Sequence, residues 1–321
     1  MHIAKNWIFA LLTTPTLVSV WVGLVLVAWH TAGGGLPLAA QIAFTLLFVG
    51  LTGIPHGAID HLVAQETAKR TKKNFTIVVF IVKYLLIMLV YAGAWWWFPS
   101  ASLLFFLLIS AWHFGETDIE NAPPTFLWNF VRLFSGSLVL GYLILTHFTE
   151  TTPVLARISQ YNSDLLAAWA VLVANKTVVL LGAGVALMGA YGAAYAQQPI
   201  VVDKMRLLRL LLILVATYFL PLMVAFALYF GGWHALCAFN TIKNYIVEPN
   251  AKTLNTIKLA FSVWAKTLLF TSIAVAFLGF STWYWFNYLN NNDPLPPLFI
   301  FLSLITLPHL TVMHDMNKRA N

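Results

Sequence analysis

The chain has 321 residues, of which 60% are hydrophobic and 9% are charged, and its mean hydropathy is +0.80. So few charged side chains cannot cover the surface of a soluble globule of this size. The composition therefore indicates an integral membrane protein and excludes a soluble enzyme, a disulfide scaffold and a disordered regulator. The net charge of +7 does not indicate a nucleic-acid-binding protein, because the basic residues cluster between apolar runs, as at 69–73.

Apolar runs long enough to cross a bilayer, which takes about 20 residues, recur along the chain. We predict an all-α, polytopic membrane helical bundle with about eight to ten membrane segments, forming one domain over 1–321. The stretch 149–175 is more polar and predicts an extramembrane or interfacial helix. The expected spans are 7–29, 38–60, 76–98, 101–117, 126–147, 177–196, 207–238, 259–281 and 295–315.

The segment 207–238 decides the orientation of the second half of the chain. With a cytoplasmic N-terminus, the basic residues at 69–73 and 204–209 fall inside, as the positive-inside rule favours. If 207–238 crosses once, the later basic loops lie outside; if it breaks near Pro221 or 231–232 and returns, every basic loop is inside. We predict a broken or re-entrant pair at 207–238, in a multi-pass protein of the inner (plasma) membrane.

Four histidines lie within or at the ends of apolar runs, where ionisable side chains are costly and therefore functional candidates: His56, His113, His234 and His309. Under the favoured topology all four fall toward the cytoplasmic half of the membrane. Convergence of four imidazoles is the geometry that a buried transition metal needs, and imidazole suits iron, copper, nickel and zinc. Any one of these histidines taken alone can instead hydrogen-bond a carbonyl of a neighbouring helix.

Two carboxylates accompany these histidines. Asp60 follows His56 by four residues and Glu116 follows His113 by three, so each pair shares a helix face. We predict that both carboxylates orient imidazoles and offset the charge of a metal ion. His61 lies about 140° round the helix from His56 and is less suited to bind the same ligand.

The residues also indicate what is absent. No histidine has another at the fourth following position, so the paired-histidine boxes of membrane di-iron desaturases and hydroxylases are missing. The chain has no Walker loop, glycine-rich nucleotide fingerprint or serine elbow. Gly57 and Gly115, each directly after a histidine, would let a neighbouring helix or a ligand approach closely.

Four motifs resemble, in this order, the family of bacterial and archaeal bacteriorhodopsin-related proteins, the integral-membrane β-carotene 15,15′-dioxygenases that make retinal for microbial rhodopsins. The likeness runs from about residue 50 to the C-terminus, and its first two motifs are long and specific. The motifs are Pro55-His56-Gly57-Ala58-Ile59-Asp60-His61, Trp112-His113-Phe114-Gly115-Glu116-Thr117-Asp118, Trp233-His234 and Pro308-His309.

The resemblance implies an Fe2+ enzyme that splits the central double bond of β-carotene, or of a related carotenoid, with O2 to give two molecules of all-trans-retinal. The polyene partitions into membrane lipid, so an embedded enzyme meets its substrate there, and the retinal product would pass to a microbial rhodopsin. We expect an apolar tunnel that aligns the polyene over the metal. Its predicted wall residues, each adjacent to a histidine, are Trp112, Phe114 and Trp233.

By motif match, three histidines carry over as iron ligands: His56, His113 and His234. The family commonly has a further histidine four residues after the third ligand, and here that position is Ala238. His309 is the preferred fourth ligand, since it matches the late proline–histidine motif, and His61 is the other candidate. A local shift of the motif, or lost or altered activity, is the remaining reading.

Two other functions stay open from the sequence. The first is a non-catalytic carotenoid- or retinoid-binding membrane protein that has kept the fold and lost a ligand at Ala238. The second is a proton- or ion-coupled transporter, which would use the same histidines and carboxylates as a relay.

Overall fold

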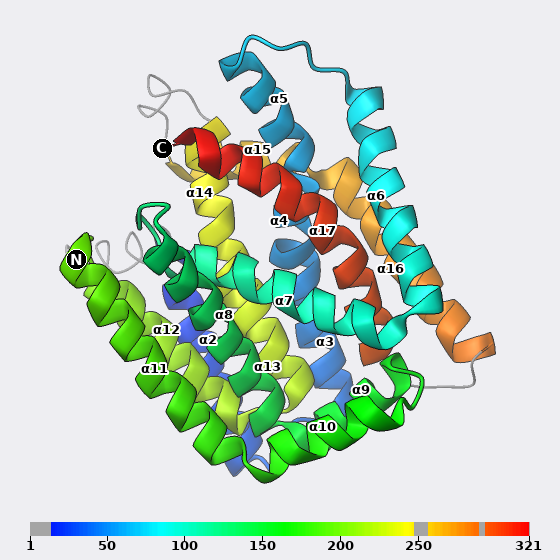
Figure 1. The fold of residues 1–321 in the computed structure, drawn as a ribbon. Helices are drawn as coiled ribbons and strands as arrows, with labels where there is room; N and C mark the ends of the chain where they lie inside the picture. Colours follow the sequence, from blue (N-terminus) through cyan, green and yellow to red (C-terminus); the bar gives the residue numbers. More distant parts are fainter. Residues whose placement is uncertain (1–13, 247–255, 289–292, 321) are drawn as a thin grey trace, which may run out of the picture. The chain divides into compact units, whose positions relative to one another are not determined.

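The computed structural model describes residues 14–246, 256–288 and 293–320, and these residues are almost entirely helical, with no strand among them (Figure 1). The predicted all-α class is therefore confirmed. Helix α2 (Pro15–Ala32) covers most of the first predicted span, 7–29, and the part of that span before residue 14 lies outside the described residues.

The chain groups into two compact units. Unit 1 comprises Met1–Tyr84, Met205–Asn291 and Thr311–Asn321, and unit 2 comprises Leu85–Lys204 and Asn292–Leu310. Helices α6 (Ile77–Trp97) and α17 (Leu295–Ala320) each have residues in both units. The single domain over 1–321 stays a prediction.

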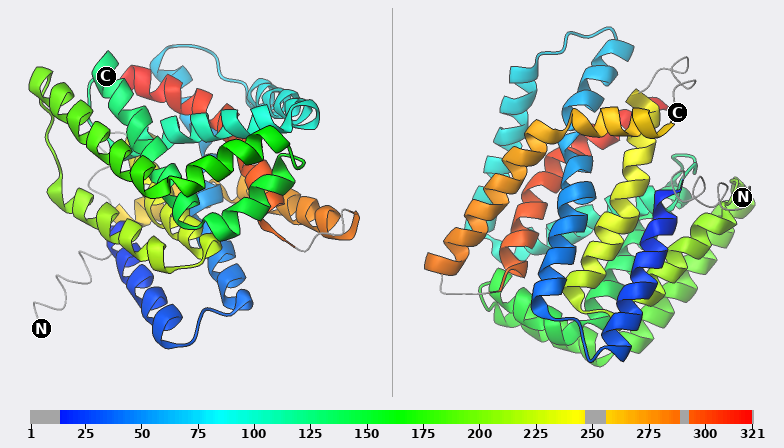
Figure 2. Two further views of the ribbon diagram at one scale, coloured as in Figure 1. Left: turned by 60° about the horizontal axis from the view of Figure 1, so that its bottom comes forward. Right: turned by 180° about the vertical axis from the view of Figure 1, so that it is seen from behind.

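Unit 1 is built around two helical passages, each interrupted by a π-helical turn. In Figure 2 (right), α3 and α13 lie side by side, and the turns η1 and η2 pack against each other. The helices of the unit besides α2 are α3 (Leu38–Phe48), η1 (Val49–Gly53), α4 (Ile54–Ala58), α5 (Asp60–Arg70), α12 (Lys204–Phe219), α13 (Leu222–Tyr229), η2 (Phe230–Ala235), α14 (Leu236–Ile246), α15 (Thr256–Ala265) and α16 (Leu268–Tyr288).

The predicted broken pair at 207–238 is present, and its break lies at Pro221, between α12 and α13. Proline lacks the backbone N–H that a continuing helix needs and restricts the residue before it. The Arg206 guanidinium lies 5.1 Å from the centre of the Trp233 ring. One straight helix would separate these two residues by about 40 Å. The chain therefore turns back at Pro221, so that α13 and η2 return alongside α12.

Unit 2 is organised around a very close crossing of two helices. The helices besides α6 and α17 are α7 (Pro99–Asp118), α8 (Phe126–Thr146), α9 (Phe148–Ile158), α10 (Ser163–Ala174) and α11 (Lys176–Gln197). Helix α8 packs against α7 on one side and α11 on the other (Figure 1). A Cβ added to Gly115 would lie 1.7 Å from the carbonyl oxygen of Arg132, and one added to Gly136 would lie 1.8 Å from that of Ala111. Only glycines allow this approach of backbone to backbone.

Eight helices of the described residues are long and apolar enough to cross a membrane, within the predicted range of eight to ten. The chain is therefore a multi-pass membrane protein. These helices are Pro15–Ala32, Leu38–Arg70, Ile77–Trp97, Phe126–Thr146, Lys176–Gln197, Leu222–Ile246, Leu268–Tyr288 and Leu295–Asn317. Most of Leu222–Ile246 is buried, whereas α6, α11 and α16 expose most of their apolar side chains.

Two span predictions need correction. The predicted span 259–281 is wrong in its bounds, because α15 ends at Ala265 and α16 begins at Leu268. The hydroxyl of Thr267 donates to the Trp264 carbonyl at the break, an alternative to helical bonding that Ser and Thr offer the backbone. The run 101–117 does form a helix, α7, but α7 is not among the eight candidate spans.

The stretch 149–175 forms α9 and α10, of 11 and 12 residues, which are too short to cross a bilayer.

Candidate metal centre

Two of the predicted ligands lie together in unit 1, each beside a π turn. His56 is in α4, directly after η1, and His234 lies inside η2. The two imidazoles are buried and meet edge to face, with 5.3 Å between ring centroids and 87° between ring planes. Because π turns shift the register of the residues that follow and are frequent at functional sites, this pairing marks a candidate site.

Glycines and one threonine bring the two π turns together. A Cβ on Gly231 would lie 2.9 Å from the Phe48 carbonyl oxygen, so a larger residue there would push η2 away. The hydroxyl of Thr52 lies 2.6 Å from the Phe48 oxygen and 2.9 Å from the Gly231 oxygen. Thr52 thus offers a donor to carbonyl groups of both passages, which keeps η1 against η2.

Pro55 leaves a carbonyl of its own helix without the usual helical donor. A residue in an α-helix donates to the carbonyl four positions earlier, which here is Leu51, and proline has no N–H to donate. The indole Nε1 of Trp264, in α15, donates to the Leu51 oxygen at 3.1 Å. Irregular backbone at membrane depth needs such a partner, so Trp264 supports the segment that carries His56.

The His56 ring is fixed by its own helix. Its Nδ1–H donates to the Gly53 carbonyl oxygen at 2.5 Å, which directs the Nε2 lone pair away from that carbonyl. Histidines that bind metals almost always donate their other ring N–H to such an acceptor. The ring of Phe230 stands edge-on to His56, at 5.7 Å between centroids, and stacks on His234 at 6.0 Å.

The other two predicted ligands lie together in unit 2. His113, in α7, and His309, in α17 directly after Pro308, are both buried. Their Nε2 atoms are 3.1 Å apart, and their ring planes stand at 83°. Two nitrogens about 2.1 Å from one metal ion stand 3.1 Å apart when they subtend about 95° at the metal. The separation therefore suits a hydrogen bond and also two ligands of one ion.

The predicted companions of these histidines have other printed contacts. Tyr84, in α6, donates its hydroxyl to Asp60 Oδ2 at 3.1 Å, a partner that the sequence analysis missed. The His61 Nδ1 bonds the Ala58 carbonyl at 2.9 Å, and its ring packs 4.6 Å from the Phe270 ring. The roles predicted for Asp60 and His61 stay predictions. Tyr84 lies in a uniformly apolar run, so spacing gave no signal for it.

The remaining predicted residues are distributed as follows. Glu116 and Trp112 are half-buried on α7, and Phe114 is buried there. Trp233 is buried with its ring beneath the Arg206 guanidinium. Ala238 is buried on α14, one turn after His234.

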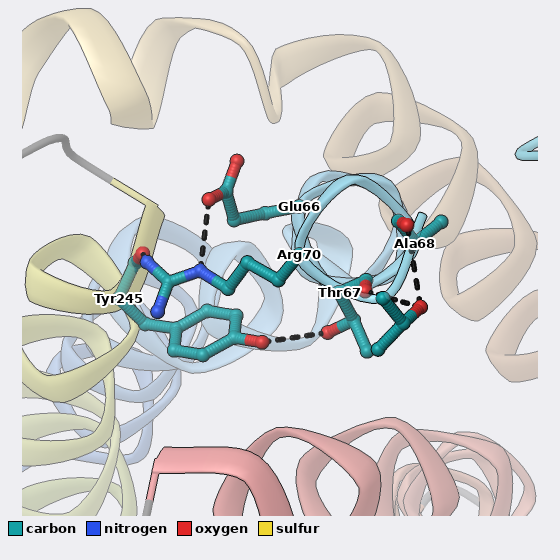
Figure 3. A network of polar contacts seen from close by, with 6 residues as sticks. Glu66, Thr67, Ala68, Arg70 and Tyr245 are labelled. Carbon is teal, nitrogen blue, oxygen red and sulfur yellow. Dashed lines mark hydrogen bonds and ion pairs between the residues drawn. The ribbon is translucent and has the colours of Figure 1, made fainter. Parts of the chain in front are cut away.

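A polar cluster joins the two helices that follow His56 and His234. Arg70, near the end of α5, bonds Glu66 and the Tyr245 carbonyl, and its guanidinium lies 4.1 Å over the Tyr245 ring (Figure 3). The hydroxyls of Thr67 and Tyr245 are 3.0 Å apart. Since Tyr245 is in the last turn of α14, Arg70 also places a cation where a helix dipole favours one.

The described part of the chain thus holds two buried imidazole pairs, one in each unit. A family model described as beta-carotene 15,15'-dioxygenase matches residues 47–317, a range that contains all four histidines. The chain belongs to the β-carotene 15,15′-dioxygenase family. The resemblance drawn from the four motifs is therefore confirmed. No curated protein and no solved structure matches this member of the family.

Proposed function

We propose that this chain is an iron-dependent dioxygenase that cleaves the central 15,15′ double bond of β-carotene to give two molecules of all-trans-retinal. One O2 molecule supplies one oxygen atom to each of the two carbons released from the double bond. The observation that carries the proposal is the pair of buried Nε2 atoms of His113 and His309, 3.1 Å apart, within a chain of this family.

The proposed ligands are His56, His113, His234 and His309, and their chemistry fits Fe2+. Neutral imidazoles suit this ion. The bond from the His56 Nδ1 to Gly53 is the kind of contact that orients a ligand for binding through Nε2. The predicted carboxylates Asp60 and Glu116 would offset the charge of the ion. When bound, iron would supply the activation of dioxygen.

The side chains around the histidines have supporting roles. Thr52 and Trp264 hold the backbone on either side of Pro55, which keeps the His56 ring from drifting. Phe230 restricts the rings of His56 and His234 and excludes water from them. Tyr84 fixes the Asp60 carboxylate. Trp112, Phe114 and Trp233 would line the path of the polyene, and His61 would stay outside the ligand set.

The proposal extends to the setting of the enzyme. The substrate and O2 would reach the site from the lipid of the inner (plasma) membrane, with the N-terminus in the cytoplasm. Retinal would leave into the same lipid, where a microbial rhodopsin can take it up.

The direct test is to purify the protein, count iron per chain and measure retinal from β-carotene under O2. The proposal expects one iron per chain, and loss of both iron and retinal in His113→Ala and His234→Ala. His61→Ala is the matched control and should keep both. Two irons per chain would mean that each imidazole pair binds its own ion. Metal-free protein that still forms retinal would refute the proposal.

Ala238 supports a second candidate, a carotenoid- or retinoid-binding protein without catalysis. A buried methyl group stands where the family commonly has a histidine. Expression in a carotene-producing host separates the two functions. Membranes that bleach and accumulate retinal support cleavage, whereas membranes that stay orange, with carotenoid bound to the purified protein and no retinal, support binding alone.

A further inference from the structure

Unit 2 contains an apolar pocket of about 540 Å³ between α6 and α7, closed on one side by Leu307 of α17. Its walls are aliphatic and aromatic, with Ala94 and Phe98 on α6 and Ala101 and Phe105 on α7. None of the residues discussed so far as ligands or tunnel walls lines it. A volume in this range is ordinary for a small-molecule site.

The polar atoms of the pocket walls are bonded to each other. The Tyr91 hydroxyl donates to the Ser102 carbonyl at 2.9 Å, which ties α6 to α7. The Trp95 indole donates to the Ser303 hydroxyl at 2.8 Å, which ties α6 to α17. These bonds leave the ring of Tyr91, edge-on to Phe105 at 5.7 Å, as an apolar surface. The pocket therefore suits a hydrocarbon without polar groups.

The pocket opens on the exposed face of α6. Leu86 and Val90 line it and are 57% and 67% exposed, although both belong to a membrane-spanning helix. Exposed apolar side chains on such a helix face lipid. A ligand dissolved in the bilayer can consequently enter from the side.

The distance from the pocket to the histidine pair matches half of a carotenoid. Along α7, Phe105 precedes His113 by eight residues, or about 12 Å. An extended carbon chain advances about 1.2 Å per bond, so the roughly nine bonds from the ring of β-carotene to its central double bond span about 11 Å. On α17, Leu307 lies two residues before His309 and so borders both places.

We propose that this pocket binds the cyclic end group of the carotenoid and thereby sets the cleaved bond beside His113 and His309. The inference rests on the proposed function and adds to it a measuring device. The ring fills the pocket at the level of Phe105, and the polyene runs along α7 toward the imidazoles. Cleavage at the centre then follows from length, since an apolar pocket offers no polar readout of position.

The test fills the pocket. Ala101→Phe is suitable because Ala101 is exposed, so the added ring extends into open space without displacing a packed helix. Ala94→Phe fills it from the opposite wall. We expect each to raise the KM for β-carotene at least tenfold, or to move cleavage off the central bond, with the iron content unchanged. Ala186→Phe, at an exposed position of α11, is the matched control and should change neither.

The outcomes separate this inference from the proposed function. Iron-loaded wild type that makes no retinal refutes the function, and β-carotene binding, followed by its visible absorption, then tests the pocket alone. Wild type that makes retinal while both filled variants keep its KM and product refutes the pocket. Loss of a co-purified phospholipid chain in those variants, with KM unchanged, would assign the pocket to a lipid and overturn the inference.

Discussion

The Nε2 atoms of His113 and His309 stand 3.1 Å apart although 196 positions separate the two residues in the chain. If both bind iron, His309→Ala removes one ligand and should reduce iron retention and retinal formation at least tenfold. The decisive variant adds Ala238→His to it. A histidine at 238 would share a helix face with His234, one turn away, so the double variant should regain iron. Metal analysis after dialysis against a chelator gives the readout.

Full activity of His309→Ala would exclude His309 from the ligand set. Failure of Ala238→His to restore iron in a folded double variant would mean that the position on α14 does not replace His309.

Gly57 and Gly115 each directly follow a histidine, yet their surroundings differ. A Cβ on Gly115 would overlap the backbone of Arg132, whereas one on Gly57 meets nothing within 4 Å. Overpacking a closed core costs about 1–3 kcal/mol, and glycine inside a helix is about 0.5–1 kcal/mol less stable than alanine. We therefore expect Gly115→Ala to lower the thermal midpoint in detergent and Gly57→Ala to keep or raise it. Equal midpoints would contradict the close α7–α8 crossing.

The same two glycines show how far the sequence could predict the site. Spacing and residue type selected the four histidines, and they are buried in pairs. A glycine after each of two histidines predicted close approach, which is confirmed for Gly115, with α8 as the neighbour. No helix uses the space beside Gly57. The sequence pattern cannot distinguish the two, because the partner backbone comes from elsewhere in the chain.

The fold was predictable where one residue imposes a local rule. Pro221 breaks the helix and reverses the chain, as expected from its missing N–H. The π turns before His56 and at His234 were not predicted, since they depend on contacts such as that of Thr52 with Gly231, 179 positions away. The break at Thr267 was likewise hidden within an apolar run.

Trp264 and Leu51 provide a test of the backbone support near His56. Trp264→Phe removes the donor to the Leu51 carbonyl. Hydrogen bonds within membrane proteins contribute about 0.6 kcal/mol on average and up to about 2 kcal/mol, so we expect a loss of about 1 kcal/mol. Adding Pro55→Ala supplies a backbone N–H at the position that lacks one and should recover part of the loss. Trp283→Phe, at a half-exposed residue of α16, is the control.

A double-mutant cycle measured by denaturant or thermal unfolding in detergent isolates the coupling between Pro55 and Trp264. Purely additive effects of the two substitutions would show that Trp264 does not compensate for the proline.

Arg70 tests whether the clamp between α5 and α14 positions the pair of His56 and His234. Its guanidinium bonds two groups and lies flat over the Tyr245 ring. Lysine keeps the charge but has neither the planar face nor the forked donors, so Arg70→Lys should destabilise unit 1 by about 1 kcal/mol. Because the clamp lies beyond the histidines on both helices, we also expect faster loss of iron to a chelator. Lys73→Met, which removes an exposed cation three residues later, should leave that rate unchanged. A merely stabilising Arg70 would lower the thermal midpoint and leave the rate of iron loss at its wild-type value.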